Sequence, residues 1–236
     1  MQPATRKLIQ AFFVVLFVLA AIRLALIWNE RRQAAAPPPP RVEGLLPADD
    51  YVVPKKTYAY DLASLRRAVI GRPIWVRMGY AYAYFPCDAG RADFRHPAGT
   101  LGPLQQLEVT AIATGVASEA PGQRQVLAVF RQDGRDYAFS VGAEKAGNMR
   151  LYIDDMVYIE DPRRLYRHWS ADVWDAVSRH QVKPGMNQLQ ASFAVGVGHA
   201  GPGDMDNRTV RYPNGGHPLE VTYEEGRAVT VKALPE

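Results

Sequence analysis

Four aromatic side chains form the strongest candidate binding feature of this sequence. Tyr80, Tyr82 and Tyr84 alternate along the chain. Because successive side chains of a β-strand point to opposite faces, these three rings are expected to line one face of a strand, and Trp75 is near enough to join it. Such a face would fit an extended or proline-rich peptide, including the chain's own residues 37–41, PPPPR. Packing is the alternative, since tyrosine suits a half-buried sheet surface.

Residues able to do catalytic or metal chemistry are present but not in useful patterns. Cys87 is the one cysteine, with no second thiol and no nearby histidine to act as a base. We expect it to be a partly buried small residue at a turn. The neighbours Asp154 and Asp155 would point to opposite faces of a strand, so they could not address one substrate. None of the five histidines has metal-ligand spacing to another: His96, His168, His180, His199 and His217.

A glycine motif at residues 196–201, GVGHAG, matches the spacing G-x-G-x-x-G. A dinucleotide site needs this motif after a strand and before a helix. Here a helix is expected before it, and Pro202 and Gly203 follow. The sequence therefore predicts no nucleotide cofactor, no metal and no enzyme activity.

The charge distribution argues against nucleic acid as a partner. The chain has 28 Lys and Arg against 24 Asp and Glu, and residues 1–50 hold six of the former and four of the latter. The remaining residues therefore carry 22 basic and 20 acidic side chains. A nucleic-acid-binding protein would concentrate positive charge on its folded part, which is not the pattern here.

Residues 8–28 predict a transmembrane helix and hence a lipid bilayer as a partner. Gln10 and Arg23 are the only polar side chains in this segment. At helical rise it would span roughly 31 Å, which matches the hydrocarbon core of a bilayer. Arg23 is expected to reach the headgroups, and Trp28 to lie at the interface. The length of the apolar run and the lack of a close small-x-small site favour an uncleaved anchor. A weak charge bias favours an amino terminus inside and the following domains exported.

The elements after this segment change character along the chain. Residues 30–56 form a proline-rich linker, and residues 61–70 predict a short helix capped by Asp61. Residues 57–160 are otherwise β-rich, with Asp133 and Gly134 at a hairpin turn. This region loosely resembles an SH3-like barrel in strand number and spacing. The predicted strands are 74–76, 80–85, 104–113, 125–131, 137–141 and 151–158.

The last part of the chain predicts helices followed by a meander. Ser170 is expected to cap a helix over residues 171–180, and residues 183–185, KPG, separate it from a helix over 186–195. After a glycine-rich loop, three strands are predicted at residues 209–212, 219–223 and 228–232.

Several motifs in this part resemble the SmpA/OmlA (BamE-like) domain family. They are VKPGMNQLQ at residues 182–190, AVG at 194–196, RTVRY at 208–212 and LEVTYEEGRAV at 219–229. The resemblance covers about residues 170–233 and implies two helices against a three-stranded antiparallel sheet. It also implies a bacterial envelope domain that binds other proteins. The family's lipid-anchoring cysteine and its Gly-x-Pro after the second helix are absent here.

Together these features predict an α+β fold with an N-terminal transmembrane helix, a small β-barrel-like domain and a helix–helix–three-strand BamE-like domain. The predicted parts are an anchor at 1–29, a linker at 30–56, a β-rich domain at 57–160 and a BamE-like domain at 161–236. The predicted function is a non-enzymatic, membrane-anchored scaffold that binds envelope proteins. An accessory subunit of an inner-membrane complex is the alternative, and a cell-wall enzyme is the third. The predicted location is the bacterial inner membrane, single-pass, with the C-terminal domains in the periplasm.

Overall fold

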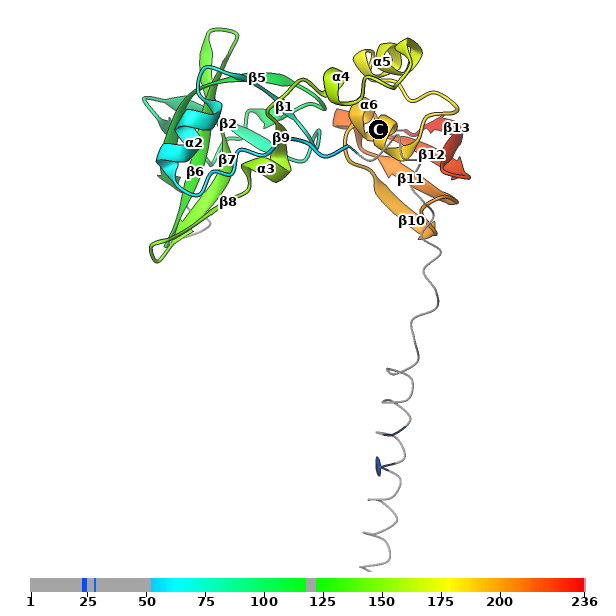
Figure 1. The fold of residues 1–236 in the computed structure, drawn as a ribbon, viewed down its shortest axis with the longest axis horizontal. Helices are drawn as coiled ribbons and strands as arrows, with labels where there is room; N and C mark the ends of the chain where they lie inside the picture. The colour runs from blue at the N-terminus through cyan, green and yellow to red at the C-terminus, as the bar shows by residue number, and fades with distance from the viewer. Residues whose placement is uncertain (1–22, 25–27, 29–51, 118–121, 236) are drawn as a thin grey trace, which may run out of the picture. The chain divides into compact units, whose positions relative to one another are not determined.

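The computed structural model describes residues 23, 24, 28, 52–117 and 122–235. Residues 49–236 belong to one compact unit. Within the described part of that unit the fold is mostly β, with two antiparallel sheets and five short α-helices (Figure 1).

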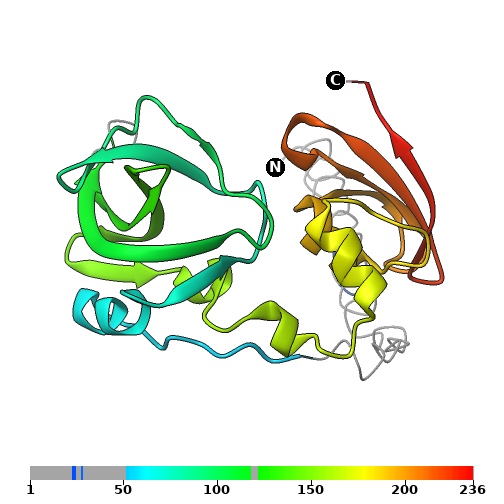
Figure 2. The ribbon, with the colours of Figure 1, turned by 90° about the horizontal axis from the view of Figure 1, so that it is seen from above.

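The first sheet has nine strands and is strongly curved, as the green strands of Figure 2 show. Its main order is β3-β2-β7-β6-β5-β1-β9, with β4 paired to β2 and β8 paired to β7. Register shifts in β5 and β6 add bends to the two longest pairings. The strands are β1 (Pro73–Val76), β2 (Ala83–Asp88), β3 (Arg91–Ala92), β4 (Gly99–Thr100), β5 (Gln106–Val116), β6 (Gln123–Gln132), β7 (Arg135–Lys145), β8 (Asn148–Leu151) and β9 (Val157–Tyr158).

The predicted hairpin turn and first helix are confirmed. Asp133 and Gly134 join β6 to β7, and both have positive φ, as a type I′ turn requires. Helix α2 (Leu62–Val69) is capped by Asp61, whose side chain accepts a hydrogen bond from the Ser64 amide. Alternation along the strands gives the sheet two buried faces. The first core includes Leu65, Val69, Ile74, Val76, Val109, Val126, Phe130, Phe139, Val141, Met156 and Val157.

The second sheet follows three helices and has the order β10-β11-β12-β13. Helix α6 packs against it, because Phe193 and Ala194 are buried in one cluster with Val210 and Val221. The elements are α4 (Pro162–Leu165), α5 (Ala171–Ser178), α6 (Gln188–Val195), β10 (His199–Gly203), β11 (Arg208–Tyr212), the 3₁₀ helix η2 (Asn214–Gly216), β12 (Leu219–Glu224) and β13 (Arg227–Ala233). The second core includes Tyr158, Tyr166, Trp169, Val177, Met186, Phe193, Val210, Tyr212, Val221 and Tyr223.

The short ladder between β1 and β9 separates these two cores. Trp75 pairs with Tyr158, and Val76 pairs with Val157. Because side chains alternate along a strand, the two valines enter the first core while Trp75 and Tyr158 pack in the second. The predicted boundary between residues 160 and 161 stays a prediction.

The predicted α+β fold class is wrong, because the described chain is mostly β. The helix–helix–three-strand arrangement is not seen either, since a fourth strand, β10, pairs with β11. Residues 199–203, HAGPG, were expected in a loop because they lack alternating apolar side chains. Backbone pairing alone makes them a strand, and the local sequence carries no signal for it.

The predicted strand over residues 151–158 is also wrong. Helix α3 (Ile153–Met156) interrupts it between β8 and β9. A distant contact supports this turn, because the Asp154 carboxylate accepts hydrogen bonds from the backbone amides of Thr57 at 2.6 Å and Tyr58 at 3.3 Å. Such a long-range contact cannot be read from strand periodicity.

Most of the segment predicted to cross a membrane lies outside the described residues, which include only Arg23, Leu24 and Trp28 from it. Among the described residues, no helix is both long enough and apolar enough to cross a membrane. This finding contradicts the predicted transmembrane helix. The predictions of a single-pass protein, a signal anchor and an inner-membrane location rested on that helix and are therefore wrong. Residues 30–51 of the predicted linker likewise lie outside the described residues.

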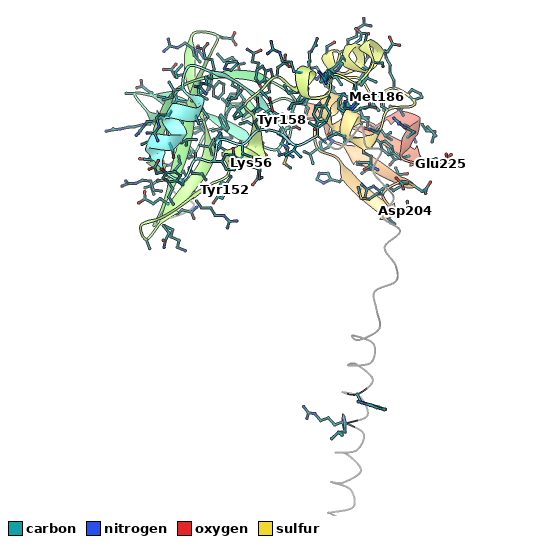
Figure 3. The ribbon with its side chains drawn as sticks, viewed as in Figure 1. Lys56, Tyr152, Tyr158, Met186, Asp204 and Glu225 are labelled. Carbon is teal, nitrogen blue, oxygen red and sulfur yellow. The ribbon has the colours of Figure 1, made fainter. Side chains whose placement is uncertain are left out.

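Met186 provides a test of the second core. It lies just before α6 and is only 2% exposed (Figure 3), and its carbonyl accepts a hydrogen bond from the Ala228 amide. We expect Met186→Ala to cost about 2–5 kcal/mol, because it removes buried carbons and leaves a cavity. Calorimetry of the full chain should show a melting temperature lower by on the order of 10 °C.

The matched control is Met205→Ala, because Met205 is 67% exposed. It should melt within about 2 °C of the parent. Equal melting of the two variants would show that Met186 does not support the second core. Gln190 of α6 is unsuitable as a control because it is buried and its side chain completes the capping box with Asn187.

Candidate functional site

The structure divides the four predicted aromatic residues into two pairs. Strand β2 begins at Ala83, and Tyr80 lies in a turn with a φ of 61°. The expected alternation of three tyrosines on one strand face is therefore wrong. Tyr82 and Tyr84 pack against the first core, and the Tyr84 ring lies edge-on to Tyr137 with centroids 5.2 Å apart.

The other pair, Trp75 and Tyr80, helps to line a pocket of about 470 Å³. Trp174 of α5 lines the same pocket, together with Pro103 before β5 and Pro162 at the start of α4. The pocket therefore combines three aromatic rings and two proline rings from segments far apart in the sequence. We call it the aromatic pocket.

Trp75 is held in the aromatic pocket by strand pairing. Its backbone pairs with Gln106 on one side and Tyr158 on the other, and its ring packs against the second core. Tyr158 (labelled in Figure 3) is almost fully buried, and this burial raises the pKa of its hydroxyl. Arg77 lies over the Tyr158 ring, with its guanidinium carbon 5.5 Å from the centroid.

Tyr80 is held by close contacts with two glycines. A Cβ at Gly196 would lie 2.7 Å from Cδ2 of Tyr80, and one at Gly215 would lie 2.8 Å from its Cε1. The ring therefore occupies space that any other residue at those positions would fill. The Val197 amide also donates to the Gly79 carbonyl at 3.2 Å, next to Tyr80. Burial raises the pKa of the Tyr80 hydroxyl above its ordinary value.

Trp174 is one member of a stack of rings. The Arg163 guanidinium carbon lies 5.5 Å from the Trp174 centroid, and the Trp169 ring is 5.2 Å away. Trp169 in turn lies 4.6 Å from the Tyr166 ring and 5.1 Å from Phe193 of α6. This stack fixes the wall of the aromatic pocket against the second core. The density of aromatic residues in YRHWSADVW, residues 166–174, was the signal that could have identified it.

Several polar groups of the aromatic pocket already bond to the protein. The Asp161 carboxylate accepts from the Arg163 amide at 2.8 Å and so caps α4. His180 donates through Nδ1 to the Ala194 carbonyl at 2.9 Å. The Gln105 side chain accepts from the Gly102 amide at 2.8 Å and contacts Gln132. A ligand would therefore meet the aromatic and proline rings together with a similar area of polar surface.

The other residues considered for chemistry are not brought together. His96 contacts Asp93 at 2.8 Å in an exposed pair. Within the described residues, no group of His, Cys, Asp and Glu is placed to hold a metal ion. Gly196 ends α6 and strand β10 begins within the glycine motif, at His199, which is not the order of a dinucleotide site.

Cys87 lies in β2, where it pairs with Ala92 of β3, and is not at a turn as expected. It packs with Leu127, Val129 and Ala138, opposite the first core, and is 8% exposed. Burial is the main cause of the raised pKa of its thiol. The reactive thiolate is therefore scarce at neutral pH.

We predict that Cys87 is protected from alkylation in the folded chain. With iodoacetamide at pH 8, it should react about tenfold or more slowly than in denaturant, because both access and thiolate formation are suppressed. Mass spectrometry of labelled protein over time measures the rate.

The control for this labelling is Lys232→Cys in a Cys87→Ser background, since Lys232 is exposed. That thiol should react at similar rates in the folded and unfolded chain. Equal rates for Cys87 and the control thiol in the folded chain would show that Cys87 is not buried against Leu127, Val129 and Ala138.

Comparison with known proteins adds no family to this picture. The chain matches no protein-family model, no curated protein and no solved structure. The resemblances to the BamE-like family and to an SH3-like barrel therefore stay predictions. The ligand of the aromatic pocket must therefore be inferred from the residues that line it.

Proposed function

We propose that this chain is a non-enzymatic protein-binding protein, and that its aromatic pocket accepts a short, extended, proline-containing segment of another protein. The observation that carries this proposal is the convergence of Trp75, Tyr80 and Trp174 on one pocket with two proline rings.

The chemistry of the pocket supports a proline-containing peptide. Grooves lined by aromatic rings are the usual receptors for polyproline II segments, because flat rings pack well against pyrrolidine rings. A polyproline segment is already extended, so it loses little conformational entropy on binding. The volume of about 470 Å³ lies within the range of pockets that bind small ligands and side chains.

The chain's own residues 37–41, PPPPR, also carry adjacent prolines, and Arg41 directly follows them. Arg163 and Asp161 both line the aromatic pocket, so the charge of the pocket does not distinguish this segment from a segment of another protein. The peptide array described below includes it for that reason.

Binding is favoured over catalysis by the roles of the polar residues. Asp161 caps a helix and His180 bonds to a backbone carbonyl, so each has a structural partner. Neither is in contact with a hydroxyl or thiol nucleophile among the contacts of the described residues. A cell-wall enzyme, the weakest of the functions considered from sequence, gains no support from the aromatic pocket.

Tyr80 gives a direct test of peptide binding. An array of proline-containing octapeptides, with PPPPRVEG included, would identify a ligand for fluorescence anisotropy. We expect Tyr80→Ala to weaken binding of that peptide about tenfold or more, as truncation of an aromatic contact at the centre of an interface does.

Tyr60→Ala is the matched control, because Tyr60 is 75% exposed and does not line the aromatic pocket. It should leave the affinity unchanged, and circular dichroism should show both variants folded. Equal affinities for the two variants would rule out the aromatic pocket as the binding site. If PPPPRVEG alone binds, the occupant is the chain's own segment.

A further inference from the structure

A second pocket, of about 560 Å³, adjoins the aromatic pocket. The two share Arg163, Trp174 and Ser178 in their linings. The second pocket is also lined by Arg167, Trp169, Ala171 and Asp175. A peptide held in the aromatic pocket would therefore have its neighbouring residues close to this second pocket.

The charges of the second pocket are unbalanced. Among the ion pairs of the described residues, neither Arg163 nor Arg167 has a carboxylate partner. Asp175 is the acid of the lining, but Arg179 bonds to it at 3.0 Å and Lys183 lies 3.9 Å from it. The positive charge of the two arginines is therefore available to a ligand.

The arrangement around Arg163 and Trp169 adds directional donors. Arg163 lies over the Trp174 ring, which restricts the position of its guanidinium group. Trp169 is 7% exposed, and its indole Nε1 has no hydrogen-bond acceptor among the described residues. Its ring contacts the rings of Tyr166, Trp174 and Phe193, and these contacts restrict rotation of the indole.

We infer that the second pocket binds a carboxylate of the same peptide, close to the proline that the aromatic pocket holds. This inference rests on the proposed function. The two guanidinium groups make the contact, since each can donate two hydrogen bonds to a carboxylate. The buried indole N–H of Trp169 is a further donor. A ligand oxygen that extends beyond the two guanidinium groups would accept a hydrogen bond from it.

A carboxylate fits this site better than a phosphate does. Asp175 belongs to the lining, and although Arg179 and Lys183 pair with it, its carboxylate repels a second anion in the same pocket. A phosphate group carries nearly two negative charges and would face Asp175 as well. The carboxylate can come from an Asp or Glu side chain or from the carboxyl terminus of the peptide.

The test compares peptides that differ in one group, using the ligand identified with the aromatic pocket. One series places Glu, Gln or phosphoserine at each of the four positions on either side of the proline. A second series ends at those positions with a free carboxylate or an amide. At the best position, the Glu or free-acid peptide should bind the full-length protein about tenfold more tightly than its Gln or amide counterpart.

Arg167→Gln is the informative variant, because Arg167 lines the second pocket and not the aromatic pocket. It should lower the affinity for the acidic peptide about tenfold and leave the affinity for the neutral peptide unchanged. Arg164→Gln is the matched control, since Arg164 is an exposed arginine nearby that lines neither pocket. It should change neither affinity, apart from a small effect that 0.5 M salt removes.

The outcomes separate this inference from the proposed function. Equal binding of the acidic and neutral peptides, both weakened by Tyr80→Ala, would overturn the carboxylate site and leave the aromatic pocket intact. Binding that needs Arg167 and the acid but ignores Tyr80→Ala would support the carboxylate site and overturn the proposed function. Tighter binding of the phosphoserine peptide would replace the carboxylate with a phosphate.

Discussion

The pairing of β1 with β9 is the constraint on which both cores and the aromatic pocket depend. Within this ladder Val76 and Val157 face the first core while Trp75 and Tyr158 face the second. A slip of β9 by one residue against β1 would exchange Val157 and Tyr158 between the cores. It would place a tyrosine ring where a valine fits and remove from the second core the ring that packs there.

The aromatic pocket is a consequence of this ladder and of small residues placed against it. The ladder presents Trp75, while Gly196 and Gly215 leave space for the Tyr80 ring. Trp174 completes the wall because α5 packs on the second core through Val177. The three rings therefore depend on the packing of the second core. A substitution in that core would change the positions of the rings that line the pocket as well as the stability of the fold.

The two pockets offer different kinds of interaction to one ligand. The aromatic pocket provides apolar area, and the second pocket provides charge from Arg163 and Arg167. Apolar contact supplies affinity without a strict directional requirement, whereas paired charges discriminate between ligands. Arg163 belongs to both linings and stacks on Trp174, so it links the two. This division would let the protein select a short sequence, with proline and acid at a set spacing.

Local sequence determined the elements whose signals lie within a few residues. The cap of α2 at Asp61, the turn at Asp133 and Gly134, and the start of α5 at Ser170 were each predicted from neighbouring side chains and are present. Strand β6, with its continuous apolar run, and strand β12, with its alternating apolar residues, were predicted for the same reason and are present. These signals are single-residue propensities and short periodicities, so they can be detected in the sequence without the structure.

Only the tertiary structure decided the elements that distant contacts support. Strand β10 exists because β11 pairs with it, and α3 is supported by hydrogen bonds from Thr57 and Tyr58 to Asp154. The sequence singled out Trp75 and Tyr80 but grouped them with two core tyrosines, and it did not indicate Trp174 or Arg163. These residues meet only because the β1–β9 ladder, α4 and α5 converge on the second core. The sequence of a chain specifies such long-range contacts only through the summed packing of the whole molecule, so no local pattern reveals them.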